Sequence, residues 1–220
     1  MTAGPDPFEG LDFEAVDWAG LSHAYGSAED VPVLIRSLVS PDADERSEAL
    51  DDLFGSICHQ GTVYPASAPA IPFLARAAVA APGQRALIGL LMSGMSRQYG
   101  EDWSDPSTFS GAVRARVASV LVELAPLLDD PEHGVRQAML RIMAVCPPPL
   151  VRAAADLREF DDEDERVRAD ALLALARVEH DWPGLRRGWR PACMTARPPS
   201  ARPRRSPCCP WTGCRSRAAP

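Results

Sequence analysis

Hydrophobic residues recur along most of the chain with the spacing of one helix face. Val31, Leu34, Ile35 and Leu38, for example, stand at i, i+3, i+4 and i+7, which places them in one apolar stripe. No stretch alternates apolar and polar residues in a way that predicts a β-ladder. The pattern predicts two helices built on the stripes Val31–Leu38 and Ala49–Ile57, followed by helices over residues 67–80, 84–98, 111–128, 132–145, 148–159 and 164–179.

Residues at the ends of the first two helices support these boundaries. Asp30 is placed to cap the first helix, whose first turn holds Pro32, where a missing N–H costs little. Gly61 is a natural residue to end the second helix, because glycine accepts the left-handed conformation that follows many helices.

Two short motifs recur at the starts of helices. One is apolar-Pro-x-Leu, which occurs at Val31–Leu34, Ile71–Leu74 and Trp182–Leu185. The other is an acidic turn followed by a helix that begins with Arg, and two of its arginines, Arg136 and Arg168, are 32 residues apart. A helix pair of that length cannot bury its apolar face alone, so we expect neighbouring pairs to stack around one continuous core.

The second motif resembles the second helix of a HEAT repeat. In its copies an acidic turn precedes Val-Arg-x-x-Ala-Leu-x-x-Leu or a close variant, and the resemblance covers about residues 28–182. The resemblance implies an all-α fold, an α-α superhelix (a HEAT-like solenoid) of about four helix pairs over residues 28–185, after an irregular N-terminal cap over residues 1–27. It also implies that turn acids and helix arginines bridge neighbouring repeats, and the residues at these positions are Asp42, Arg46, Asp130, Arg136, Asp162 and Arg168.

Charge divides the chain into two parts. Of the 220 residues, 1–181 hold 14 Arg and all 30 acidic residues, whereas 182–220 hold 9 Arg and no acidic residue. The apolar stripe ends near Arg186, and Arg, Pro, Ser and Cys dominate residues 186–220. One interpretation of this last segment is a disordered basic tail.

A second interpretation is that residues 186–220 are an out-of-frame translation. When the residues from Leu185 onward are written as codon families and read in the shifted frame, one permitted translation contains an acidic turn, Val-Arg and an Ala/Leu-rich helix. Its arginine would follow Arg168 by 33 positions, close to the 32 that separate Arg136 from Arg168. We favour this interpretation, and the coding DNA tests it, because the shifted frame should remain open.

The sequence offers little catalytic or metal-binding chemistry. None of the 4 His stands in a His-x-x-x-His pair, and neither a glycine-rich phosphate loop nor a Gly-x-Ser-x-Gly nucleophile motif is present. We therefore expect no catalytic residue, no metal and no cofactor. Cys58 and Cys146 suit buried thiols in a reducing cytoplasm. We expect a cytoplasmic protein, because the sequence shows neither a signal-peptide pattern nor an apolar run long enough for a membrane span.

Two polar and aromatic blocks, Asp17–Gly26 and Cys58–Pro65, occur once each. Together they resemble a group of bacterial HEAT-repeat proteins that share a helix–His-Gln-Gly-Thr-Val-Tyr–helix arrangement and have no assigned function. One interpretation of the second block is a tight loop between repeats, in which Tyr64 packs inward and His59 bonds to a carbonyl. The other interpretation is a recognition patch made of Trp18, His23, Tyr25, His59, Gln60, Thr62 and Tyr64.

The expected function follows from the expected fold. A solenoid offers an extended concave face, so we expect a non-enzymatic scaffold or adaptor that binds an unknown protein. One alternative is an immunity or inhibitor protein that neutralises a basic, toxin-like partner by charge complementarity. Another is an enzyme of the HEAT-like bilin lyase type, which rests on analogy of fold. We expect no nucleic-acid partner, because the surplus of acid in residues 1–181 repels phosphate.

Overall fold

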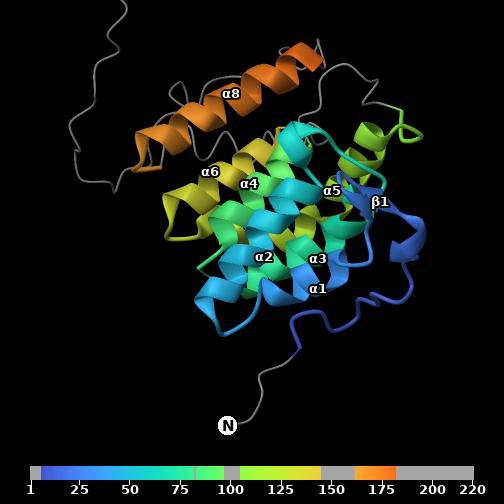
Figure 1. Cartoon of the computed structure of the whole chain (residues 1–220). Helices are drawn as coiled ribbons and strands as arrows, with labels where there is room; N and C mark the ends of the chain where they lie inside the picture. The colour runs from blue at the N-terminus through green and yellow to red at the C-terminus, as the bar shows by residue number, and fades with distance from the viewer. Residues whose placement is uncertain (1–5, 82, 97–104, 145–161, 182–220) are drawn as a thin grey trace, which may run out of the picture. The chain divides into compact units, whose positions relative to one another are not determined.

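The computed structural model describes residues 6–81, 83–96, 105–144 and 162–181, with side chains as far as residue 174 in the last range. These residues are mostly α-helical and include seven α-helices, which confirms the prediction of a helical fold (Figure 1). The predicted helix over 148–159 and the two interpretations of residues 186–220 lie outside the described residues. The helices are α1 (Val31–Ser37), α2 (Ala43–Ser56), α3 (Ser67–Ala80), α4 (Arg85–Met95), α5 (Phe109–Leu124), α6 (His133–Met143) and α8 (Glu165–Asp181).

The helix ends differ from the predicted ones where local chemistry intervenes. The single helix predicted over 111–128 ends at Leu124 and continues as a 3₁₀ turn, Ala125–Asp129, because Pro126 has no N–H for the α-helical ladder. Asp30 does not cap α1 through its side chain, since its carboxylate lies 3.0 Å from the His23 ring instead.

The described helices contact one another in two rows. In the odd row, α1 contacts α3 and α3 contacts α5; in the even row, α2 contacts α4, α4 contacts α6, and α6 contacts α8. The rows meet where α1 packs on α2, α3 on α4 and α5 on α6. Burial of apolar surface between the rows is the main force that holds them together. Among the large side chains with no exposed surface in this core are Ile35, Leu38, Leu53, Ile57, Ile71, Leu74, Ile88, Leu91, Met92 and Met95.

The segment before α1 folds onto α1 and α3 through aromatic side chains. The Phe13 ring stacks on Phe73 of α3 with the ring centroids 4.0 Å apart, and the Arg36 guanidinium of α1 lies 4.0 Å from the Phe13 centroid. Trp18 is also buried, and its indole N–H donates to the Phe13 carbonyl at 2.9 Å. The segment is therefore fixed on the odd row from two sides.

A short antiparallel ladder, β1 (Ser22–His23) with β2 (Gly26–Ser27), completes this segment, so the expectation of no ladder was wrong. Strands of two residues cannot show an alternating pattern, which explains why the sequence did not reveal them. Gly26 has a φ of +131°, which permits the tight turn between the strands. Among the described residues, no helix combines the length and the hydrophobicity that crossing a bilayer requires.

Candidate recognition surface

The β1–β2 hairpin joins the two unusual sequence blocks in space. The Ala24 N–H donates to the Ser56 carbonyl at the end of α2 at 3.1 Å, and the Ala66 N–H before α3 donates to the Ser22 carbonyl at 3.2 Å. The hairpin is thus bonded to both sides of the α2–α3 junction. Residues from Asp17–Gly26 and from Cys58–Pro65 consequently form one surface, although more than 30 positions separate Tyr25 from His59.

The α2–α3 junction is a rigid turn. Gln60 (φ +51°) and Gly61 (φ +82°) are both left-handed, which reverses the chain directly after α2. Nδ1 of His59 donates to the Gly55 carbonyl at 2.9 Å, so this side chain caps α2 in the way that the loop interpretation expects. The Ser67 hydroxyl accepts from the Tyr64 N–H at 2.8 Å and donates to the Ile57 carbonyl at 2.6 Å. These bonds leave the junction little freedom to move.

His23 is held in one tautomer beneath this surface. Its Nδ1 accepts from the Tyr25 N–H at 3.0 Å, so the ring hydrogen is on Nε2, which donates to Asp30 at 3.0 Å. The side chain is 5% exposed. His23 therefore positions the hairpin and offers a partner no free donor.

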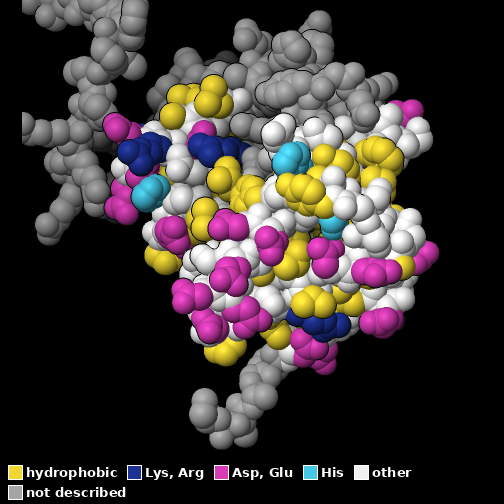
Figure 2. Space-filling view, viewed as in Figure 1, with side chains coloured by type: hydrophobic (Ala, Val, Ile, Leu, Met, Phe, Trp, Pro, Cys, Tyr) yellow, Lys and Arg dark blue, Asp and Glu magenta, His cyan; other side chains and the backbone are white. Residues whose placement is uncertain are grey.

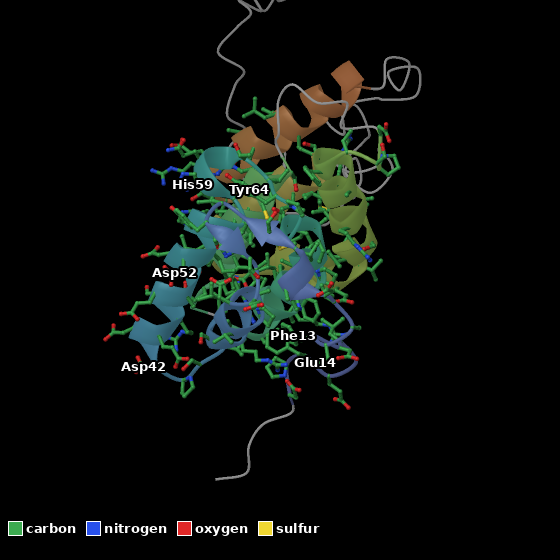
Figure 3. All side chains as sticks on the ribbon, turned by 45° about the vertical axis from the view of Figure 1, so that its right-hand side comes forward. Phe13, Glu14, Asp42, Asp52, His59 and Tyr64 are labelled. Carbon is green, nitrogen blue, oxygen red and sulfur yellow. The ribbon has the colours of Figure 1, made fainter. Side chains whose placement is uncertain are left out.

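The structure divides the predicted recognition residues into a buried and an exposed group. Trp18 and His23 are buried, so they act as support and do not reach a partner. Tyr25 is 72% exposed, and its ring centroid lies 5.6 Å from that of His59, edge to face. Figure 3 shows His59 and Tyr64 at the same end of the molecule. We name the exposed and half-buried members the Tyr25–His59 patch, and they are Tyr25, His59, Gln60, Thr62 and Tyr64.

Cys58, beside the patch, is buried. Burial raises the pKa of its thiol to about 11, so the thiol keeps its proton at neutral pH. Its Sγ faces Gly94 of α4, where an added Cβ would lie 3.4 Å away. The side chain fills space between α2 and α4.

Arg136 links α6 to the turn before α8. Its Nε and Nη2 donate to the two oxygens of Asp162 at 2.8 and 2.9 Å, and its Nη1 donates to the Asp130 carbonyl at 2.8 Å. The side chains are 9% and 2% exposed, and this pairing raises the pKa of the Arg136 guanidinium. A bidentate pair of this kind fixes both distance and orientation.

Arg85, which the sequence motif missed, makes the equivalent link between α4 and the turn before α6. It begins α4, and its Nη1 donates to Asp130 at 2.8 Å while its Nη2 donates to the Val79 carbonyl at 3.0 Å. Each arginine thus bonds the carbonyl six residues before it and the acid of the next turn. The signal was absent from the sequence because no acidic turn precedes Arg85.

The other predicted inter-repeat residues act within their own turns. Arg46 donates to the Ser40 carbonyl at 2.7 Å and Arg168 to the Asp162 carbonyl at 2.8 Å, both six residues back. Asp42 accepts from the Asp44 N–H at 2.9 Å and so caps α2. Within the described residues, neither Asp42 nor Arg46 bonds to another helix pair. In the turn that follows Arg46 along the helix pairs, Val79 stands six residues before an arginine, as Asp130 and Asp162 do in the later turns. Because valine has no carboxylate, Arg46 has no acid to pair with there.

The outer face of α2 is acidic. Asp44, Glu48, Asp51 and Asp52 are all exposed, and the single basic residue of this helix, Arg46, turns toward the Ser40 carbonyl. In Figure 2, acidic side chains gather over the region where Figure 1 places α2. Figure 3 places Asp52 between Asp42 and His59 along the same side, so the acidic face leads toward the patch.

Comparisons with family models, curated proteins and solved structures find no match for this chain. Among the side chains that the structure describes, no group of three or more His, Cys, Asp and Glu could hold a metal ion.

Proposed function

We propose that this protein is a non-enzymatic protein-interaction scaffold and that the Tyr25–His59 patch contacts its partner. The observation that carries the proposal is an aromatic side chain that is 72% exposed on a backbone bonded from both sides. Aromatic residues at rigid positions contribute much of the energy in protein interfaces, because little side-chain freedom is lost on binding. Gln60 and Thr62 add neutral hydrogen-bonding groups around the ring.

We further propose that the chain is a HEAT-like solenoid, with α1–α2, α3–α4 and α5–α6 as repeats and α8 as the second helix of another. Two features support this proposal. Odd helices contact odd helices and even helices contact even helices, as in stacked pairs. In addition, Arg85 and Arg136 make the same two kinds of bond, to the carbonyl six residues back and to the acid of the next turn.

Affinity purification from the source cells tests the scaffold proposal. The tagged wild-type protein should retain a specific partner, and the double variant Tyr25→Ala/His59→Ala should lose most of it. Val122→Ala is the matched control, because Val122 is 82% exposed and lies outside the patch. Thermal unfolding of all three proteins shows whether the fold is intact. Equal partner recovery with the double variant, at an unchanged melting temperature, would refute the patch.

The acidic face of α2 favours a second candidate, an inhibitor that neutralises a basic partner. Complementary charge speeds association and makes it sensitive to salt. Replacing Asp44, Glu48, Asp51 and Asp52 by their amides should then slow association with the captured partner and flatten its salt dependence. Glu45 is left intact, because it accepts from the Ser37 hydroxyl at 2.7 Å and ties α2 to α1. An unchanged association rate would remove this candidate and leave the scaffold proposal standing.

A further inference from the structure

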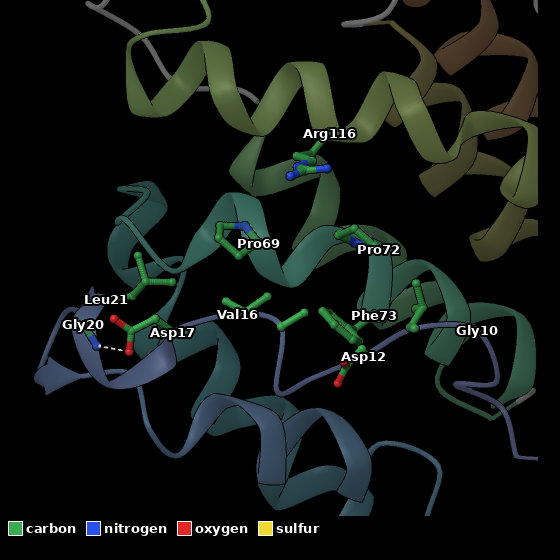
Figure 4. A pocket seen from close by; sticks show the side chains of 12 residues that line it. Gly10, Asp12, Val16, Asp17, Gly20, Leu21, Pro69, Pro72, Phe73 and Arg116 are labelled. Carbon is green, nitrogen blue, oxygen red and sulfur yellow. Dashed lines mark hydrogen bonds between the residues drawn. The ribbon is translucent and has the colours of Figure 1, made fainter.

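A groove between the segment before α1, α3 and α5 offers a second binding surface. It consists of two neighbouring hollows of about 490 and 480 Å³ that share Pro69 and Arg116. Figure 4 shows Arg116 pointing from α5 toward Pro69 and Pro72 of α3. None of the residues that line the hollows belongs to the Tyr25–His59 patch. Apolar side chains line the first hollow, namely Leu11, Val16, Leu21, Pro72 and Phe73.

Aromatic side chains pack behind Phe73, which lines the first hollow. Phe73 stacks on Phe13, and the Trp18 ring lies 6.1 Å from Phe73 between centroids. All three side chains are at most 6% exposed. A ligand that enters a preformed apolar hollow pays little to order the protein.

The groove carries one positive charge, that of Arg116, whereas Asp12 and Asp17 place two negative charges in the first hollow. Arg116 is the one basic residue that lines either hollow, and its guanidinium has no ion-pair partner among the described residues. Arg76 on α3, by contrast, pairs with Glu123 at 3.0 Å. Asp12 and Asp17 line the first hollow and disfavour further negative charge there. The groove therefore suits one anionic group at Arg116 with apolar groups on either side.

Small side chains line the second hollow. Ala68, Ala112 and Ala115 belong to this lining, together with Arg116.

We propose that this groove binds an extended segment of a partner protein in which an acidic residue stands between two apolar residues, in the pattern apolar-x-Glu-x-apolar. In an extended chain, side chains at i, i+2 and i+4 point to the same side. The central acid pairs with Arg116, and the flanking apolar side chains enter the two hollows. The inference is independent of the patch, since Tyr25→Ala/His59→Ala leaves every groove residue unchanged.

Fluorescence anisotropy of the full chain with labelled ten-residue peptides tests the proposal. The probes carry Leu or Phe at the two apolar positions and Glu, Gln or Lys between them. The Glu peptides should bind about threefold tighter than the Gln peptides, because Arg116 is exposed and solvent screens its ion pair with the peptide. Arg116→Ala should abolish that difference, and Arg116→Glu should shift the preference to the Lys peptides. Arg166→Ala removes an exposed arginine of α8 and should change nothing.

A second variant probes the apolar part of the site. Ala115 is exposed and lines the second hollow, so Ala115→Trp should fill the hollow and weaken all peptides alike. Three results would overturn the proposal: no binding of the Glu peptides up to about 1 mM, the same Glu preference in Arg116→Ala, or full binding by Ala115→Trp. Unchanged thermal unfolding of the variants shows that none of these results reflects loss of the fold.

Discussion

At the scale of single residues, the Arg136 guanidinium bonds to two turns at once. It pairs with both oxygens of Asp162, whose side chain is 2% exposed, and caps the Asp130 carbonyl. Arg136→Ala should lower the free energy of unfolding by about 3 kcal/mol, because it leaves a buried carboxylate without its partner. Arg46→Ala should cost about 1 kcal/mol, since Arg46 is half-buried and bonds one carbonyl. Urea denaturation of both variants measures the difference, and equal costs would contradict a structural role for the Asp162 pair.

Cys58 predicts a dependence of stability on pH. Its native pKa is raised from 9.0 to about 11, so as the pH rises the unfolded thiol loses its proton first. The contribution of this thiol to stability is therefore present below about pH 9 and decreases between about pH 9 and 11. The difference in unfolding free energy between the wild type and Cys58→Ala should shrink over that range. A difference in unfolding free energy that stays constant from about pH 7.5 to about pH 10.5 would show that folding does not change the pKa of the Cys58 thiol.

At the scale of elements, Gly89 sets the approach of α4 to α6. A Cβ at this position would lie 2.7 Å from the Cβ of Ala138 and 3.1 Å from Cε of Met139. Gly89→Ala should therefore destabilise the protein by about 1–3 kcal/mol, because the helices would have to separate. Helix propensity alone would predict that replacing this glycine by alanine raises the free energy of unfolding by about 1 kcal/mol.

Gly134→Ala is the matched control for this prediction. It adds a Cβ at the same helix interface, at an ordinary 3.4 Å from the Cβ of Ala86. Thermal unfolding should show it to be neutral or slightly stabilising. A stabilising Gly89→Ala would mean that α4 and α6 pack less closely than described.

The elements also show what a single sequence can and cannot predict. Helices such as α3, predicted over 67–80 and found at Ser67–Ala80, follow from local apolar spacing. The partner of Arg136 does not follow from local spacing, because the motif places an acid six residues before Arg136 and another six residues before Arg168. Only the stacking of the helices brings Asp162 to the Arg136 guanidinium. The burial of Trp18 depends on Phe73, which is far away in the sequence. Tyr25 and His59 meet for a similar reason, through hydrogen bonds of the hairpin that no local pattern encodes.

At the scale of the whole molecule, the surplus of acidic residues predicts that the helical part does not bind DNA. Residues 1–181 hold 14 Arg against 30 acidic residues. A variant that ends at residue 185 should not bind duplex DNA at micromolar concentration in about 150 mM salt, because phosphate is repelled. The shorter chain is needed, since the 9 Arg of residues 182–220 can bind nucleic acid without specificity. Electrophoretic mobility shift would detect binding, and a shifted band would revive a nucleic-acid function.

Site-specific photo-crosslinking shows whether a partner protein contacts Tyr25 in the cell. A benzophenone amino acid replaces Tyr25 in one protein and Val122 in a control, which are 72% and 82% exposed. After irradiation in the source cells, the protein with benzophenone at position 25 should form a discrete crosslinked species with one other protein, and the protein with benzophenone at position 122 should not. Adding His59→Ala to the protein with benzophenone at position 25 should reduce that species. The same faint background from both positions, with both proteins folded, would show that no partner contacts Tyr25.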